Sequence, residues 1–333
     1  MILSPAIMAL VFGSLLLTFF ALYSSWIGTQ IILRWDISNG SERQLALERK
    51  TYLISTILAY LMGFELFSFF LYVYTADSLH EIFIGAMCAA GSLNAAAAGY
   101  PTLIFKIINV LACGIWLVLN HTDNQGYDYP LIKAKYKLLL VITASLTMES
   151  ILQWQYFSSL KADVIASCCG TLFSENADNI VGDLASISSS AGKFVLMVGF
   201  LLMIRTGGYF LWTGKGARLF AWVSTGLFIL AIVSIISFIS VYFYELPTHH
   251  CPFCVLQADY HYIGYPLYLS ILMGGIMGAG VGVLQRFQGT GSLLEIIPRA
   301  QKKLCWGTIL SYTIFAAISI YPMVFSDFKL EGY

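Results

Sequence analysis

The stretch that decides the fold is residues 5–33, PAIMALVFGSLLLTFFALYSSWIGTQIIL, which contains no charged side chain. An α-helix needs about 20 mostly apolar residues to cross the hydrocarbon core of a membrane. A secretory signal peptide is the competing interpretation. This run lacks a basic leader and is longer than a signal-peptide core, so we expect it to be a retained transmembrane helix.

The composition of the whole chain agrees with this interpretation. Of its 333 residues, 18 are Lys or Arg and 18 are Asp or Glu, so 11% are charged. An ordinary soluble protein has about 25%. Because 58% of the residues are hydrophobic, so few charges cannot cover a water-soluble globule. The net charge is zero and indicates no nucleic-acid partner. We predict an all-α integral membrane protein.

Eight apolar runs are long enough to span a membrane. They are residues 5–33, 51–74, 100–119, 138–157, 191–211, 219–244, 255–284 and 304–325. The loops after the first, third, fifth and seventh runs, with the adjoining run ends, carry 14 of the 18 basic residues. By the positive-inside rule these loops are cytoplasmic, so both termini are expected on the outer face. The connections 75–99, 158–190 and 245–254 then also lie outside.

Five of the seven cysteines lie in these outer connections or at the outer ends of helices. They are Cys88, Cys168, Cys169, Cys251 and Cys254. Disulfides persist on the outer face of a bacterial plasma membrane, or in the lumen of a eukaryotic compartment. We therefore expect a protein of the bacterial inner (plasma) membrane whose cysteine-bearing loops face the periplasm or exterior.

The most specific motif is HHCPFC at residues 249–254. Proline suits the first position of a helix, so we expect Cys251 to cap the seventh helix, with Cys254 one turn further on. Cys-x-x-Cys at a helix N-terminus lowers the thiol pKa and makes a disulfide easy to open and close. Two other interpretations remain open: a structural disulfide, and a metal site that uses both histidines and both cysteines. Redox chemistry is favoured.

With these residues placed, residues 137–284 resemble the vitamin K epoxide reductase family. The resemblance is carried by the Cys-x-x-Cys before the seventh apolar run and by residues 167–173, SCCGTLF. It implies a four-helix bundle in which Cys169, beside Cys168, is a shuttle cysteine and Phe173 lines a quinone pocket. Cys254 would face the quinone on the wall of an apolar pocket, and Cys251 would be its exchange partner.

The resemblance divides the chain into three regions. Residues 1–136 form a three-helix membrane region, 137–284 the four-helix bundle, and 285–333 a C-terminal transmembrane helix. The segment CAAGSLN at 88–94, before a Gly-Tyr-Pro helix start, is similar to the same pattern. It suggests a degenerate first copy at about 51–157.

Several polar residues lie within or near the apolar runs. Asp259, Tyr260 and His261 follow the Cys-x-x-Cys closely enough to reach a quinone carbonyl. The charged residues near or within spans are Glu65, Lys106, Glu149 and Lys193. Charges there need partners, because burying one alone in lipid costs at least about 2.5 kcal/mol. We expect the two lysines to extend towards the membrane surface. The alternative, in which the lysines pair with Glu65 and Glu149 beside a quinone or proton path, is equally favoured for the glutamates.

The function expected from the sequence is a membrane thiol–disulfide oxidoreductase. It would exchange electrons between Cys251, Cys254 and the loop cysteines and a non-covalently bound quinone, menaquinone or ubiquinone. Its natural protein partner would be a thioredoxin-like carrier on the outer face. The alternatives are a non-catalytic quinone-binding or anchor subunit of a larger membrane redox complex and a metal-handling membrane protein.

Overall fold

The structure is a computed structural model that describes residues 4–37, 40–161, 166, 182, 188–328 and 330. Every regular element in these ranges is helical. The long helices are α1 (Pro5–Arg34), α2 (Glu42–Ser78), α4 (Gly99–Asp123), α5 (Ile132–Ser159), α8 (Ser189–Thr213), α9 (Ala217–Ser234), α11 (Gly264–Gln285) and α12 (Ile296–Phe325). The short ones are α3 (Ala89–Asn94), α10 (Ser240–Tyr244), the π-helical turn η2 (Ile235–Ile239) and the 3-10 turns η1 (Leu79–Ile82), η3 (Cys254–Leu256), η4 (Ala258–Tyr260) and η5 (Gly291–Leu293).

Seven helices within the described residues are long and apolar enough to cross a membrane. They comprise α1, α2 with η1, α4, α8, α9 through α10, α11 and α12. The fourth predicted span, 138–157, lies within α5, a continuous helix of 28 residues. α5 is not among the seven; besides its apolar run it contains Lys133, Lys135, Lys137, Glu149 and Gln153. The prediction of an all-helical protein with long apolar helices is therefore confirmed for the described part of the chain.

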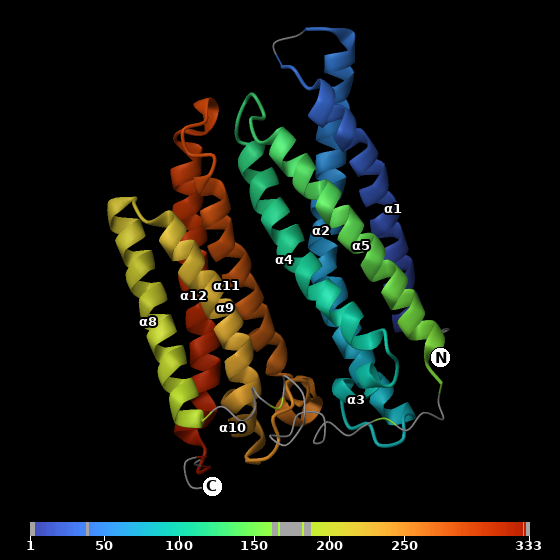
Figure 1. Cartoon of the computed structure of the whole chain (residues 1–333), viewed down its shortest axis with the longest axis vertical. Helices are drawn as coiled ribbons and strands as arrows, with labels where there is room; N and C mark the ends of the chain where they lie inside the picture. Colours follow the sequence, from blue (N-terminus) through green and yellow to red (C-terminus); the bar gives the residue numbers. More distant parts are fainter. Residues whose placement is uncertain are drawn as a thin grey trace. The chain divides into compact units, whose positions relative to one another are not determined.

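The chain divides into two compact units (Figure 1). The first unit contains residues 1–72, 97–160 and 283–301, and the second contains 73–96, 161–282 and 302–333. The predicted bundle 137–284 therefore contributes α5 to the first unit and α8, α9 and α11 to the second.

The first unit is built around α5, which packs against α1 and α4. Small and hydroxyl-bearing side chains let these helices approach closely. A Cβ atom on Gly28 of α1 would lie 2.8 Å from the Tyr136 ring of α5. The Ser25 and Thr143 hydroxyls, on the same two helices, are hydrogen-bonded at 2.7 Å. Such contacts are typical of helix pairs in membranes, where close packing and interhelical hydrogen bonds replace the hydrophobic effect.

In the second unit, glycines on α11 allow close packing against its neighbours. A Cβ atom on Gly274 would lie 2.9 Å from the Tyr312 ring of α12, and one on Gly282 would lie 2.5 Å from Ala221 Cβ of α9. The Tyr312 hydroxyl also donates a hydrogen bond to the Ser224 carbonyl of α9 at 2.8 Å. This packing places the turns at the ends of α9 and α11 in fixed positions within the unit.

The seventh predicted span begins later than the sequence indicated. Cys251 and Pro252 lie in an irregular segment, two short 3-10 turns follow, and α11 begins only at Gly264. His261 and Tyr262 have φ of 53° and 56°, which a right-handed helix cannot contain. The prediction that Cys251 caps the helix is therefore wrong. Pro266 lies in the first turn of α11, where a missing N–H costs no hydrogen bond.

Candidate functional site

Three cysteines of the second unit share one buried site. The sulfur atoms of Cys88, Cys251 and Cys254 all lie within 4.8 Å of one another. Cys88 and Cys251 are 0% exposed and Cys254 is 6% exposed. The Cys88 and Cys251 sulfurs are 3.5 Å apart. None of the cysteines in the described ranges is disulfide-bonded, so the structure shows three neighbouring thiols.

Cys88 is held at the start of α3. Its backbone is extended, and its carbonyl accepts hydrogen bonds from Gly91 N at 3.1 Å and Ser92 N at 3.4 Å. The Asp77 carboxylate accepts a hydrogen bond from Ala89 N at 3.0 Å. These bonds fix the turn that carries the Cys88 side chain.

Gln257 connects this turn to the segment that carries the other two cysteines. Its side-chain amide donates to the Asp77 carboxylate at 3.2 Å and to the Met87 carbonyl at 2.9 Å. Met87 precedes Cys88, and Gln257 follows Cys254 by three residues. Two stretches about 170 residues apart in sequence are thereby joined next to their thiols.

Two tyrosines hold the segment from Cys251 to Val255. The Tyr244 hydroxyl donates to the Cys251 carbonyl at 2.6 Å and accepts from Val255 N at 2.8 Å. The Tyr268 hydroxyl of α11 donates to the Pro252 carbonyl at 2.5 Å. The Tyr244 hydroxyl is thus hydrogen-bonded to the backbone at both ends of the Cys-x-x-Cys. These bonds define the separation of the two cysteines although they do not lie in an α-helix.

The two histidines of the motif have different surroundings. His249 Nε2 lies 3.4 Å from Cys254 Sγ, and its ring meets the Tyr244 ring edge-on at 4.8 Å. His250 is buried, and its Nδ1 lies 3.0 Å from the Ser237 carbonyl in the π-helical turn η2. His249 can therefore exchange a proton with Cys254, whereas His250 anchors the segment to η2.

The geometry of the cluster also suits a metal ion. Zn–S bonds of about 2.3 Å in a tetrahedral site place neighbouring sulfurs roughly 3.8 Å apart. The Cys88–Cys251 separation of 3.5 Å is close to this value. His249, 3.4 Å from the Cys254 sulfur, would supply a nitrogen as fourth ligand. The donor set Cys₃His suits zinc, and the three sulfurs also suit other thiophilic ions.

The other residues predicted for the site fall in two places. Cys168, Cys169 and Phe173 lie outside the described residues. Asp259, Tyr260 and His261 line an open pocket of about 430 Å³ in the second unit. Its remaining lining comes from Tyr242, Phe243, Glu245, Ile263, Tyr321, Pro322, Phe325 and Ser326.

This pocket adjoins the cysteines through aromatic contacts. The Tyr260 ring packs against the Tyr244 ring with centroids 4.8 Å apart, and Tyr244 is bonded to the Cys251 carbonyl. For Cys88 the sequence offers no catalytic role, only an ordinary disulfide with Cys168 or Cys169 as an alternative, and that pair lies outside the described residues. The place of Cys88 in the predicted outer connection 75–99 was the one signal that could have grouped it with Cys251.

A second, apolar pocket of about 270 Å³ lies among α8, α9, η2 and α12. It is lined by Lys193, Leu196, Met197, Phe200, Leu227, Phe238, Phe315, Ala316, Ser319, Ile320 and Met323. Cys254 is not among the residues that line this pocket. The Lys193 ammonium donates to the Tyr242 hydroxyl at 2.6 Å.

Three of the four charged residues predicted near or within spans, Glu65, Lys106 and Glu149, meet in the first unit. Lys106 of α4 is 0% exposed, and its ammonium lies 2.6 Å from the Glu149 carboxylate and 3.7 Å from that of Glu65. Ser68 accepts a further bond from it at 2.8 Å. The expectation that Lys106 extends to the membrane surface is wrong, because carboxylates on α2 and α5 compensate its charge inside the unit.

A comparison of the chain with protein-family models, curated proteins and solved structures finds no match.

Proposed function

We propose that the protein is a membrane thiol–disulfide oxidoreductase that passes electrons between Cys88, Cys251 and Cys254 and a membrane quinone. One observation carries the proposal: three buried cysteine sulfurs, from segments far apart in the chain, lie within 4.8 Å of one another. Cysteines that serve only as small apolar packing residues are not expected to bring three sulfur atoms this close together.

The chemistry balances as a two-electron reaction. Two thiols and a quinone give a disulfide and a quinol, and both protons move to the quinone oxygens. The Cys88 and Cys251 sulfurs need to approach from 3.5 Å to a bond of about 2.05 Å. The Cys254 thiolate would then attack the Cys251 sulfur and release Cys88 as a thiolate.

His249 is the base for this exchange. Its Nε2 is 3.4 Å from the Cys254 sulfur, so the imidazole accepts the proton as the thiolate forms. Proton acceptance raises the nucleophilicity of the sulfur, since the thiolate and not the thiol is the attacking species.

The open pocket beside the cluster is the proposed quinone site. Its volume of about 430 Å³ and its aromatic lining suit a flat ring, and Asp259, Tyr260 and His261 provide polar groups for the carbonyl oxygens. By the charge asymmetry of the loops, the cluster faces the outside of a bacterial plasma membrane. There it would receive electrons from a thioredoxin-like carrier, with Cys168 and Cys169 as intermediates.

The test is quinone reduction by the purified protein in detergent. Dithiothreitol serves as electron donor and ubiquinone-1 as acceptor, and the decrease in quinone absorbance is followed. Cys251→Ser and Cys254→Ser should reduce the rate to that of the uncatalysed reaction, and Cys88→Ser should do the same. Cys113→Ala and Cys305→Ala are matched controls, because these buried cysteines lie on α4 and α12 outside the cluster. Full turnover by Cys251→Ser would overturn the proposal.

A metal site is the second candidate, favoured by the sulfur spacing and by His249. It predicts one bound ion per chain in protein purified without chelator, measured by inductively coupled plasma mass spectrometry. Cys88→Ser and His249→Ala should both lose this ion, whereas His261→Asn should retain it. A stoichiometric ion together with absent quinone turnover would assign the cluster to metal binding. An anchor subunit instead predicts that Cys251→Ser lowers stability or assembly and that the unchanged protein has no turnover.

A further inference from the structure

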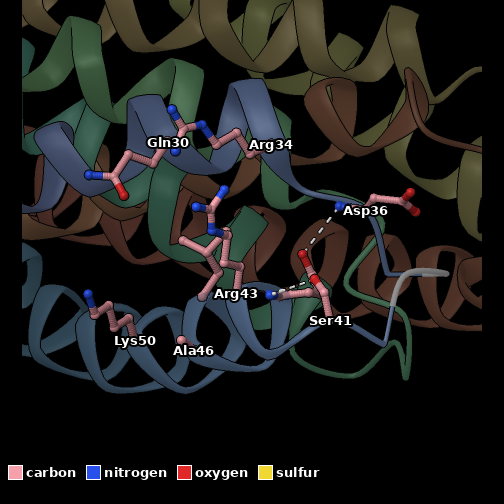
Figure 2. A pocket seen from close by; sticks show the side chains of 9 residues that line it. Gln30, Arg34, Asp36, Ser41, Arg43, Ala46 and Lys50 are labelled. Carbon is pink, nitrogen blue, oxygen red and sulfur yellow. Dashed lines mark hydrogen bonds between the residues drawn. The ribbon is translucent and has the colours of Figure 1, made fainter.

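A basic pocket lies in the first unit, where α1 ends and α2 begins (Figure 2). Its volume is about 420 Å³. It is lined by Gln30, Arg34, Asp36, Ser41, Arg43, Gln44, Ala46, Leu47 and Lys50. None of these residues belongs to the cysteine cluster or to the pockets beside it, so the pocket requires its own explanation.

Three cations converge on the pocket from two helices. Arg34 is the last residue of α1, and Arg43 and Lys50 are seven positions apart on α2, which places them on one face. Figure 2 shows Gln30 and Arg34 across from Arg43 and Lys50. Asp36 is the one carboxylate in the lining, so three positive charges less one negative charge leave a net charge of +2.

The connection between the helices is held by Gln44. This side chain is 4% exposed, and its Oε1 accepts a hydrogen bond from Asp36 N at 3.3 Å. Gln44 N donates to the Ser41 hydroxyl at 3.4 Å. The N-terminus of α2 adds the partial positive charge of its helix dipole next to Arg43. The hydrogen bonds of Gln44 thus hold the connection that lies beside the three cations.

The position of the pocket at the end of α1 indicates which kind of anion it binds. Ala46 and Leu47 line the pocket itself, and the sequence neighbours Leu33 and Ile37 are 79% and 47% exposed. Because α1 is long enough to span a membrane, Arg34 at its end lies at the level of the lipid headgroups. A ligand there that carries both a phosphate and acyl chains matches the cations of the pocket and the apolar surface of the adjoining span together.

We propose that this pocket binds the phosphate of an anionic phospholipid, with Arg34, Arg43 and Lys50 as its partners. The net charge of +2 favours a lipid with net negative charge over a zwitterionic one. Inorganic phosphate offers the same oxygen atoms but has no acyl chains for the apolar surface of α1. The proposal is independent of the redox chemistry of the cysteine cluster.

The test is lipid binding by the full-length protein in detergent, followed by native mass spectrometry. The probes are dioleoylphosphatidylglycerol, dioleoylphosphatidylcholine and inorganic phosphate. Phosphatidylglycerol should bind and the other two should not. Each of Arg34→Gln, Arg43→Gln and Lys50→Gln should weaken phosphatidylglycerol binding about fivefold, since one cation near an anionic membrane contributes about 1 kcal/mol.

Two further variants make the outcome decisive. Arg49→Gln removes an exposed arginine of α2 that does not line the pocket, so it should leave binding unchanged. Asp36→Asn removes the opposing carboxylate and should tighten binding about fivefold. Equal binding of the two lipids, an equal loss in Arg49→Gln, or weaker binding in Asp36→Asn would overturn the proposal. Binding of inorganic phosphate as tight as that of the lipid would assign the pocket to a soluble anion instead.

Discussion

At the scale of single residues, the cysteine cluster is positioned by side chains that form hydrogen bonds with the backbone around it. Tyr244 bonds to the Cys251 carbonyl and to Val255 N, and Gln257 bonds to Asp77 and to the Met87 carbonyl. His249 is the exception, because its nitrogen lies beside the Cys254 sulfur at 3.4 Å.

The role of His249 gives a prediction on thiol reactivity. In His249→Ala the Cys254 thiol loses its proton acceptor, so its alkylation by iodoacetamide should slow about tenfold at neutral pH, because the thiolate is the reacting form. The rate is measured by mass spectrometry of the peptide that contains Cys254. His261→Asn is the matched control. It changes an exposed histidine of the neighbouring turn and keeps a residue that tolerates positive φ. Equal rates in all three proteins would exclude His249 as the base.

At the scale of helices, the first unit is held together by charges that the membrane does not solvate. Lys106 on α4 is bonded to Glu149 on α5 and lies near Glu65 on α2, all at most 1% exposed. Breaking a buried ion pair costs more than the pair contributes, because the remaining charge is left without compensation. The cluster therefore makes the packing of three helices interdependent.

This interdependence predicts a strong effect of Lys106→Met. The free energy of unfolding should fall by about 3–5 kcal/mol, because the Glu149 carboxylate keeps its burial and loses its partner. The double variant Lys106→Met with Glu149→Gln should recover part of the loss. The measurement is the loss of the helical circular dichroism signal on heating in detergent. The free energies of unfolding of the variants are compared at one temperature.

A surface ion pair provides the control for this measurement. Arg299 and Glu295 are 2.8 Å apart, and their side chains are 75% and 82% exposed. Solvent and salt screen such a pair, so Arg299→Gln should leave the midpoint nearly unchanged. If Lys106→Met were as mild as Arg299→Gln, the buried charges would not hold the helices together.

At the scale of the whole molecule, the long apolar helices indicate a membrane protein, and the distribution of basic residues predicts its orientation. The loop between α4 and α5 exposes Tyr127 at 85%, and the loop after α10 exposes Leu246 at 54%. The positive-inside rule predicts that the first loop is cytoplasmic and that the second lies outside.

This orientation predicts opposite labelling of two introduced thiols. A membrane-impermeant maleimide applied to intact cells should label Leu246→Cys above the level of the unchanged protein and should leave Tyr127→Cys at that level. After permeabilisation both should react. The reverse pattern in intact cells would show that the cysteine cluster faces the cytoplasm, where disulfides are rare and the proposed redox role would lose its compartment.

The sequence by itself determined the helical class and the positions of the long helices, because hydropathy over about 20 residues is a local property. Residues 5–33, for example, lie in α1 almost end to end. It also singled out Cys251 and Cys254, since the Cys-x-x-Cys spacing is read directly from the chain. The start of the seventh helix was misplaced, because an apolar run does not reveal the positive φ values of His261 and Tyr262.

Only the tertiary structure decided which groups meet. Cys88 reaches Cys251 across 163 positions of sequence, and no local pattern encodes that approach. Lys106 is buried because Glu149, 43 positions away, lies opposite on another helix. The physical reason is the same in both cases. The reactivity of a buried thiol and the compensation of a buried charge depend on neighbouring groups, and the packing of the helices decides which groups are neighbours.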